Sequence, residues 1–139
     1  RGYRAGLAAG GVTLSGAVVV SPATYAGGAS AVERAWATGR TPTAILAMSD
    51  ILAFGALEAA EELGAPVPAE LSVVGFDDSP GAAHASPPLT TVSQPHEEKG
   101  RLAAGALIEA IERGSRGEPS RTFLPTELVV RESTAPPRR

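Results

Sequence analysis

The sequence predicts an α/β domain built on a doubly wound parallel sheet, and two observations support this prediction. Apolar runs such as AVVV at 17–20, AILAM at 44–48 and SVVGF at 72–76 lack the polar alternation of a half-exposed antiparallel sheet. Segments with the apolar spacing of helices lie between these runs. Strands that alternate with helices in this way are typical of a parallel sheet covered by helices.

Each element in the first half of the chain has a local signal. Gly10, Gly11 and Gly39 close two helical patterns, and an apolar run follows each of them. We therefore expect, in chain order, a helix over 1–11, a strand over 16–21, a helix over Gly28–Thr38 and a strand over 43–49.

The second half opens with the strongest helical pattern, ILAFGALEAAEEL at 51–63, which Ser49-Asp50 introduces and Gly64 ends. Pro95 stands where a later helix would begin, because proline is favoured at the first turn of a helix. We expect a loop over 65–70, a strand over 71–76, a loop over 77–88, a strand over 89–94, a helix over 97–113 and a strand over 126–133.

Composition narrows the function. The 139 residues suffice for one domain, and the absence of cysteine excludes disulfides and cysteine-based zinc sites. The net charge is −3, and Lys99 is the only lysine. The nearest approach to a basic cluster is formed by Arg131, Arg138 and Arg139, and we interpret this stretch as a Pro-rich tail. Because DNA-binding surfaces need clustered Lys and Arg, we expect no grip on nucleic acid by this chain alone.

The residues of this chain show no pattern of a membrane span or of a signal peptide. No apolar run approaches the roughly 20 residues that span a bilayer, and no signal-peptide pattern is present. We expect no membrane partner and a cytoplasmic location. The chain begins at Arg1, already within a helical pattern, so we expect it to be a piece of a longer protein.

Polar residues gather at the predicted carboxyl ends of the strands, where such sheets bind ligands. The stretch SVVGFDDSPG at 72–81 passes from an apolar strand to two adjacent acids, Asp77 and Asp78. Alternation along a strand sends the two acids to different sides, which makes them a poor acid–base pair. One carboxylate suits the paired hydroxyls of a small polyol or sugar. The alternative is that either acid caps the turn at Ser79-Pro80.

Ser49 and Asp50 stand between a strand and the strongest helix. We expect Asp50 to act mainly as a structural helix cap or first-turn acid. Ser49 is the better candidate to face a ligand, and its alternative role is a capping hydroxyl.

Signatures of catalysis and of cofactors are missing from the sequence. There is no G-x-S-x-G, G-x-G-x-x-G or Walker pattern. His84 and His96 are the only histidines, which is too few for a recognisable metal site. We expect a protein that is not an enzyme and has no cofactor or metal. An α/β enzyme that uses Asp77 and His96 is a rival hypothesis, and it lacks an identifiable nucleophile.

Five stretches, in order, resemble the effector-binding domain of LacI/GalR-type bacterial transcription regulators. They are RGYRAGL, RTPTAILAMSDILAFGAL, ELSVVGFDDSP, PPLTTVSQP and LPTELVVREST. The resemblance implies a periplasmic-binding-protein-like fold of type I with two lobes. It implies that residues 1–88 form most of the C-terminal lobe, that 89–118 are a crossover strand and a helix of the N-terminal lobe, and that 119–139 are a return strand and tail.

The same resemblance implies roles for particular residues. Asp77 matches the acid that hydrogen-bonds effector hydroxyls, and Ser49 matches the Asn or Ser that contacts the ligand. His96 falls where an aromatic residue often lines the pocket, and Gln94 lies near the crossing between the lobes. Phe54 and His84 are candidates for a homodimer interface. Operator DNA would be bound only through a helix-turn-helix that lies upstream of this sequence.

Two departures from the family pattern bear on the ligand. The family's ligand-binding arginine stands three residues before the glycine that is Gly2 here, which is ahead of Arg1. Tyr25 is the aromatic residue nearest to the position where sugar-binding members carry one, and it is slightly out of register. The rival within this fold is a periplasmic sugar-binding protein of an ABC transporter. The combination of PPLTTVSQP with LVVREST near the end of the sequence favours the regulators over these transport proteins.

Overall fold

The computed structural model describes residues 2–12, 18–39, 41–114 and 121–136. Its sheet has the order β1-β2-β3-β4, formed by β1 (Ala44–Leu46), β2 (Ser72–Asp77), β3 (Thr90–Ser93) and β4 (Glu127–Val129). The first three strands are parallel, and β4 runs antiparallel to β3. The α/β prediction is confirmed, with one antiparallel strand added to the expected parallel sheet. The chain leaves the sheet along β3 and returns along β4, which makes these two strands antiparallel.

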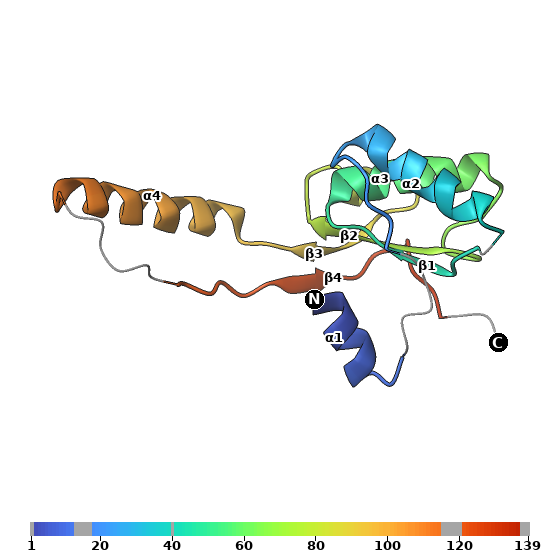
Figure 1. The fold of residues 1–139 in the computed structure, drawn as a ribbon, viewed down its shortest axis with the longest axis horizontal. Helices are drawn as coiled ribbons and strands as arrows, with labels where there is room; N and C mark the ends of the chain where they lie inside the picture. Colours follow the sequence, from blue (N-terminus) through green and yellow to red (C-terminus); the bar gives the residue numbers. More distant parts are fainter. Residues whose placement is uncertain (1, 13–17, 40, 115–120, 137–139) are drawn as a thin grey trace.

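Helices α2 (Tyr25–Ala37) and α3 (Asp50–Glu62) lie together on one face of the sheet, and α1 (Gly2–Ala9) lies on the other side (Figure 1). The core sits between α3 and the sheet, where Ala53, Ala60, Leu71, Val73 and Leu89 are almost fully buried. A short 3-10 helix, η1 (Ala82–His84), follows β2. Helix α3 therefore supplies much of the buried surface that packs against the sheet.

Close contact between α2 and α3 requires glycine. A Cβ atom on Gly28 would overlap the carbonyl oxygen of Leu52, and one on Gly55 would overlap that of Tyr25. The two backbones can approach this closely only because neither glycine carries a side chain. The N-terminus of α3 lies at the end of β1, because only three residues separate Leu46 from Asp50.

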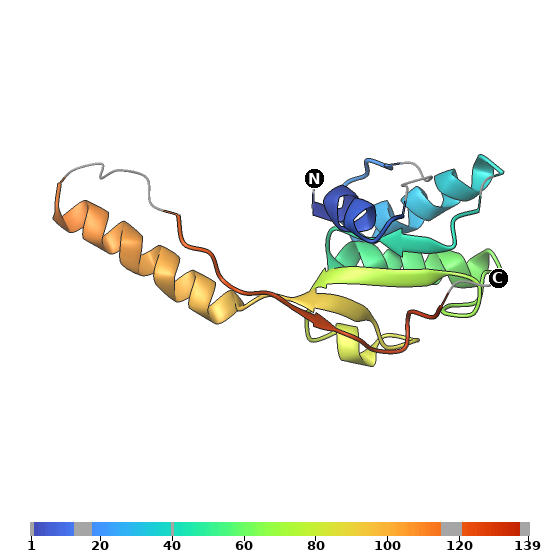
Figure 2. The ribbon, with the colours of Figure 1, turned by 90° about the horizontal axis from the view of Figure 1, so that it is seen from below.

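Helix α4 (His96–Glu112) projects away from the sheet (Figures 1 and 2). It lies between β3 and β4 in the chain. Its side chains Leu107, Ile108 and Ile111 are all more than half exposed. An apolar helix face of this kind is typical of a surface that another structural unit covers.

Several predicted boundaries need correction. No strand forms over Val18–Ser21, and residues 16 and 17 of that predicted strand lie outside the described residues. Val18 and Val20 are exposed, and the Val20 carbonyl accepts a hydrogen bond from Arg34 of α2 rather than from a neighbouring strand. Helix α2 begins earlier than Gly28, because the Thr24 hydroxyl accepts a hydrogen bond from Gly27 N at 3.0 Å and caps it.

Gly55→Ala in the full-length protein is expected to lower the unfolding free energy by about 2–3 kcal/mol, because the added methyl group overpacks the α2–α3 contact. Urea denaturation followed by circular dichroism measures this. Glu61→Ala, an exposed change on the same helix, is the control and should alter stability by less than about 0.5 kcal/mol. Equal stability of the two variants would contradict the proposed role of Gly55.

Candidate functional site

The strand register places Ser49 and Asp77 at the same end of the sheet. Leu46 of β1 pairs with Val74 of β2, and Asp77 at the end of β2 pairs with Ser93 at the end of β3. Ser49 follows Leu46 by the same number of residues as Asp77 follows Val74. The carboxyl ends of the three parallel strands therefore form one polar edge, which we call the carboxyl edge.

Asp50 is the buried centre of this edge, with 1% of its surface exposed. Its Oδ2 accepts a hydrogen bond from Ser79 N at 2.6 Å, and its Oδ1 accepts one from Thr91 Oγ1, also at 2.6 Å. The carboxylate thus joins the start of α3 to the turn after β2 and to the middle of β3. Asp50 is the first residue of α3 and the acid of its first turn, while the N-cap position is taken by Ser49. The hydrogen bonds of the Asp50 carboxylate go to segments far away in the chain.

Gly75 makes room for this carboxylate. A Cβ atom at that position would overlap Asp50 Oδ1 and press on the Leu89 side chain. The glycine in SVVGFDD is therefore explained by the close approach of a buried acid to β2.

The two acids after β2 adopt backbone conformations that are rare for residues other than glycine. The angle φ is 120° at Asp77 and 56° at Asp78. Such conformations cost on the order of 1–3 kcal/mol each and persist only where surrounding contacts hold them. Asp78 is held by Arg131, whose Nη2 donates to Asp78 Oδ1 at 2.7 Å, and by a long contact of 3.4 Å from Asp78 N to Thr91 Oγ1.

Asp77 faces a different set of side chains. Its Oδ1 accepts a hydrogen bond from Gln94 Nε2 at 2.6 Å, and its carbonyl oxygen lies 2.8 Å from His96 Nε2, which donates when it carries the proton. Gln94 Oε1 accepts in turn from Lys99 Nζ at 3.1 Å. Within the described part of the chain, Asp77 Oδ2 has no protein partner, so one carboxylate oxygen is left to accept hydrogen bonds from a ligand.

Two buried hydroxyl groups also lack a partner among the described residues, namely Ser49 Oγ and Ser79 Oγ. Ser49 occupies the N-cap position of α3 but makes no side-chain capping bond, which excludes the alternative of a capping hydroxyl. A buried hydroxyl without a partner costs about 1–3 kcal/mol, so both positions favour an additional polar group at this edge. The sequence analysis did not identify Ser79.

The alternative hypothesis was that Asp77 or Asp78 caps the turn after β2, and neither side chain does so. Ser79 N is bound by Asp50, which lies 29 residues earlier in the chain. Asp78 forms an ion pair with Arg131, and both side chains are mostly buried. The interpretation of Arg131 as part of a basic tail is therefore wrong, because its guanidinium is fixed inside the fold.

Three predicted residues lie outside the group at the carboxyl edge. Tyr25 begins α2 and interacts with Glu58 of α3, and its partial removal from water together with the Glu58 carboxylate raises the pKa of its hydroxyl. The ring of Phe54 lies against Gly81, and His84 is exposed at the end of η1. The latter two are on the α3–η1 side of the domain, where a partner subunit was expected.

Arg131, Ser133 and Thr91 are important residues that sequence reasoning missed. Ser133 is fully buried, and its hydroxyl donates to the Val73 carbonyl and accepts from Thr90 N. The stretch LVVREST contained both Arg131 and Ser133, but no local pattern shows which strands they contact. Thr91 was the available signal for a buried polar contact, because it stands in a strand that the sequence predicts to be buried and a buried hydroxyl needs a hydrogen-bond partner.

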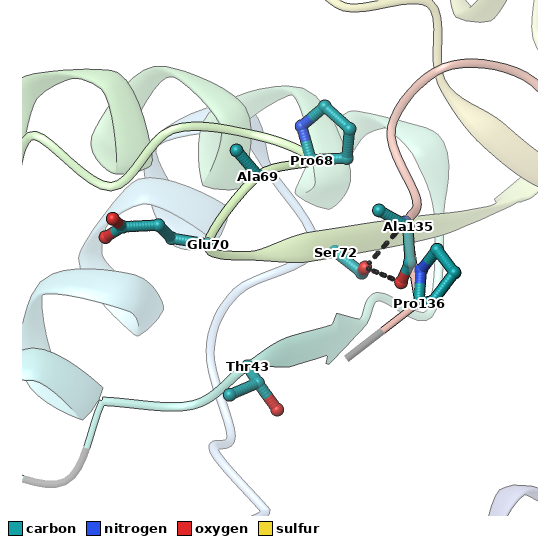
Figure 3. A pocket seen from close by; sticks show the side chains of 7 residues that line it. All are labelled: Thr43, Pro68, Ala69, Glu70, Ser72, Ala135 and Pro136. Atoms are coloured by element: carbon teal, nitrogen blue, oxygen red, sulfur yellow. Dashed lines mark hydrogen bonds between the residues drawn. The ribbon is translucent and has the colours of Figure 1, made fainter. Parts of the chain in front are cut away.

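A shallow cavity of about 250 Å³ lies at the opposite end of the sheet (Figure 3). It lies where β1 and β2 begin, and Ser72, one of its polar lining residues, is already bonded to the backbone of Ala135. Ligands of parallel sheets bind at the carboxyl ends of the strands, so this cavity is not our candidate site.

The described residues limit two further possibilities. They contain no group of three His, Cys, Asp or Glu side chains arranged to hold a metal ion. None of the helices in the described ranges combines the length and apolar character that a bilayer crossing requires.

The chain belongs to the family of the periplasmic binding protein-like domain, whose model matches residues 1–134. It is 48% identical over 97 residues to the HTH-type transcriptional regulator MalR of Streptomyces coelicolor, a match that covers 70% of this chain and 28% of that protein. The predicted fold and the predicted resemblance to regulators are both confirmed.

Solved structures agree. A complex of the transcriptional regulator CelR with cellobiose has a TM-score of 0.82 and 37% identity, covering 95% of this chain and 40% of that one. A LacI family transcriptional regulator from Enterococcus faecium with bound ribose has a TM-score of 0.84 and 27% identity, covering 99% and 50%. The chain thus spans half or less of each of these relatives.

Thr91→Val is expected to lower the unfolding free energy by about 1–3 kcal/mol, because it removes a hydrogen-bond donor from the buried Asp50 carboxylate. Thr41→Val is the matched control, since Thr41 is exposed and lies outside the helices and strands. Denaturant titration of the full-length variants compares the two. A similar small effect in both would show that Asp50 does not depend on Thr91.

Proposed function

We propose that this chain is the effector-sensing part of a LacI-type transcriptional regulator, and that its effector is a sugar or a related polyol. The observation that carries the proposal is the convergence of Asp77, Ser49, Gln94 and His96 at one edge of the sheet. The cellobiose and ribose bound by relatives support a sugar as the class of ligand.

Each residue has a distinct role in this proposal. Asp77 Oδ2 accepts hydrogen bonds from ligand hydroxyls, and the buried Ser49 hydroxyl supplies a second polar contact. Gln94 orients Asp77 by holding its other oxygen. The exposed ring of His96 offers a flat surface beside Asp77. Tyr25 makes no hydrogen bond to Asp77, Ser49 or Gln94 in the described part of the chain, so we assign it no role in this site.

The remaining half of the grip would come from a second lobe that includes α4. The exposed apolar residues of α4 support this assignment, since a second lobe would cover them. We place residues 1–88 and 119–139 in the lobe with the sheet. Residues 89–118 lead out of it, although β3 itself pairs along its whole length with β2.

A ligand held by both lobes would act by shifting the population of two lobe arrangements. It favours one arrangement only in so far as it binds that arrangement more tightly. In a homodimer, with Phe54 and His84 at the interface, such a shift would reset the distance between two helix-turn-helix units on operator DNA. We propose a cytoplasmic location, because binding to operator DNA takes place there. The names of its relatives favour a regulator over a transport protein and over an enzyme.

Asp77→Ala in the full-length protein is expected to abolish the response to effector while operator binding remains. Loss of hydrogen bonds to a charged acceptor weakens binding by at least about tenfold. Fluorescence anisotropy on operator DNA, with and without cellobiose and ribose, measures both properties. Glu61→Ala, which removes an exposed carboxylate from α3, is the control. An unchanged response of the Asp77 variant would remove this residue from the site.

A further inference from the structure

We propose that Arg131 is a positioning residue for the carboxyl edge. Its guanidinium holds Asp78 so that the neighbouring Asp77 keeps the backbone conformation in which its carboxylate serves the ligand. The inference rests on the proposed function of this edge, and it concerns a residue that needs no contact with the ligand.

Arg131 is fixed at three points. Nη2 donates to Asp78 Oδ1 at 2.7 Å, Nη1 donates to the Leu89 carbonyl at 2.7 Å, and the backbone N–H donates to Thr90 Oγ1 at 2.9 Å. The side chains of Arg131 and Asp78 are 20% and 23% exposed. The planar guanidinium therefore connects the turn after β2 to the start of β3 in a defined orientation.

The positive φ angles of Asp77 and Asp78 show why this contact is needed. Two adjacent residues with side chains adopt conformations that suit glycine, so contacts from outside the turn must hold them. Asp50 holds Ser79 N, and Thr91 lies near Asp78 N. Gln94 holds the side chain of Asp77, and Arg131 holds the side chain of Asp78, the second residue of the strained pair.

The position of Arg131 in the chain also links Asp77 to α4. Arg131 follows β4, along which the chain returns from α4, and β4 pairs with β3 from Ser93–Glu127 to Thr91–Val129. Gln94, which binds the Asp77 carboxylate, follows β3, along which the chain leaves for α4. Gln94, directly after β3, contacts Asp77, and Arg131, shortly after β4, contacts Asp78. Both strands that connect to α4 are therefore followed by a residue that binds this pair.

A purely structural ion pair would behave differently. An exposed pair such as Arg113–Glu109, with side chains 74% and 65% exposed, contributes little to stability. A buried pair without a positioning role would change stability but leave the ligand affinity of the folded protein unaltered. Affinity and the geometry of residues 77–79 thus separate the two roles.

The test uses the full-length protein with Arg131→Met, Arg131→Lys and the control Arg113→Met. We expect crystal structures to show that Arg131→Met loses the positive φ at Asp77 or the contact of Asp77 with Gln94. Calorimetric titration with cellobiose and with ribose should show about tenfold or greater weakening, because a strained conformation must be recovered on binding. Arg131→Lys should be intermediate, since lysine keeps the charge but not the two-pronged geometry. Arg113→Met should match the wild type.

A rescue variant keeps the test decisive if Arg131→Met folds poorly. In Asp78→Gly/Arg131→Met, glycine adopts a positive φ without strain and no acid is left unpaired. We expect this double variant to recover most of the lost affinity. The proposal is overturned if Arg131→Met keeps the wild-type geometry at 77–79, or if it binds within twofold of the wild type.

Failure of the proposed function would look different. A wild-type protein that binds neither sugar contradicts the sugar assignment, whereas the crystal structures still decide whether Arg131 holds the Asp77–Asp78 pair. Retention of both positive φ angles in Arg131→Met would then overturn the positioning role on its own.

Discussion

The buried carboxylate of Asp50 is the contact on which the geometry of the carboxyl edge depends. A buried charge must be hydrogen-bonded, and Asp50 meets this requirement with partners 29 and 41 residues away. Its position brings the start of α3, the turn after β2 and the middle of β3 into one arrangement. Ser49 directly precedes Asp50, and Asp77 lies two residues before Ser79, which Asp50 binds. The contacts of Asp50 therefore help to fix the positions of both candidate ligand-binding residues.

Three acids near one another have three different tasks. Asp50 is consumed by contacts within the fold, and Asp78 is paired with Arg131. Asp77 keeps one carboxylate oxygen without a partner in the described part of the chain. Asp50 binds Ser79 N and Asp78 binds Arg131, and both contacts stabilise the turn that carries Asp77. The positive φ angles of Asp77 and Asp78 are energetically costly, and contacts from other segments offset this cost.

We propose that the carboxyl edge forms half of a binding site and that a second lobe, which includes α4, supplies the other half. Helix α4 stands apart from the sheet (Figures 1 and 2), and its residues Leu107, Ile108 and Ile111 are exposed. The chain spans half or less of the relatives compared with it. Contacts from Gln94 and Arg131 reach the Asp77–Asp78 pair from the two strands that lead to α4. In the proposed function, these contacts connect a ligand at the carboxyl edge with the placement of α4.

Local patterns in the sequence determined the class of fold, the position of most helices and strands, and the edge at which Ser49 and Asp77 meet. Periodicity, glycine and proline act over a few neighbouring residues, and the parallel arrangement then aligns the strand ends. Only the tertiary structure decided that Arg131 pairs with Asp78, 53 residues away, and that Asp50 binds Ser79 and Thr91. It also decided that Val18–Ser21 form no strand. Such pairings depend on strand register and side-chain direction, which arise from the packing of distant segments and leave no signal in neighbouring residues.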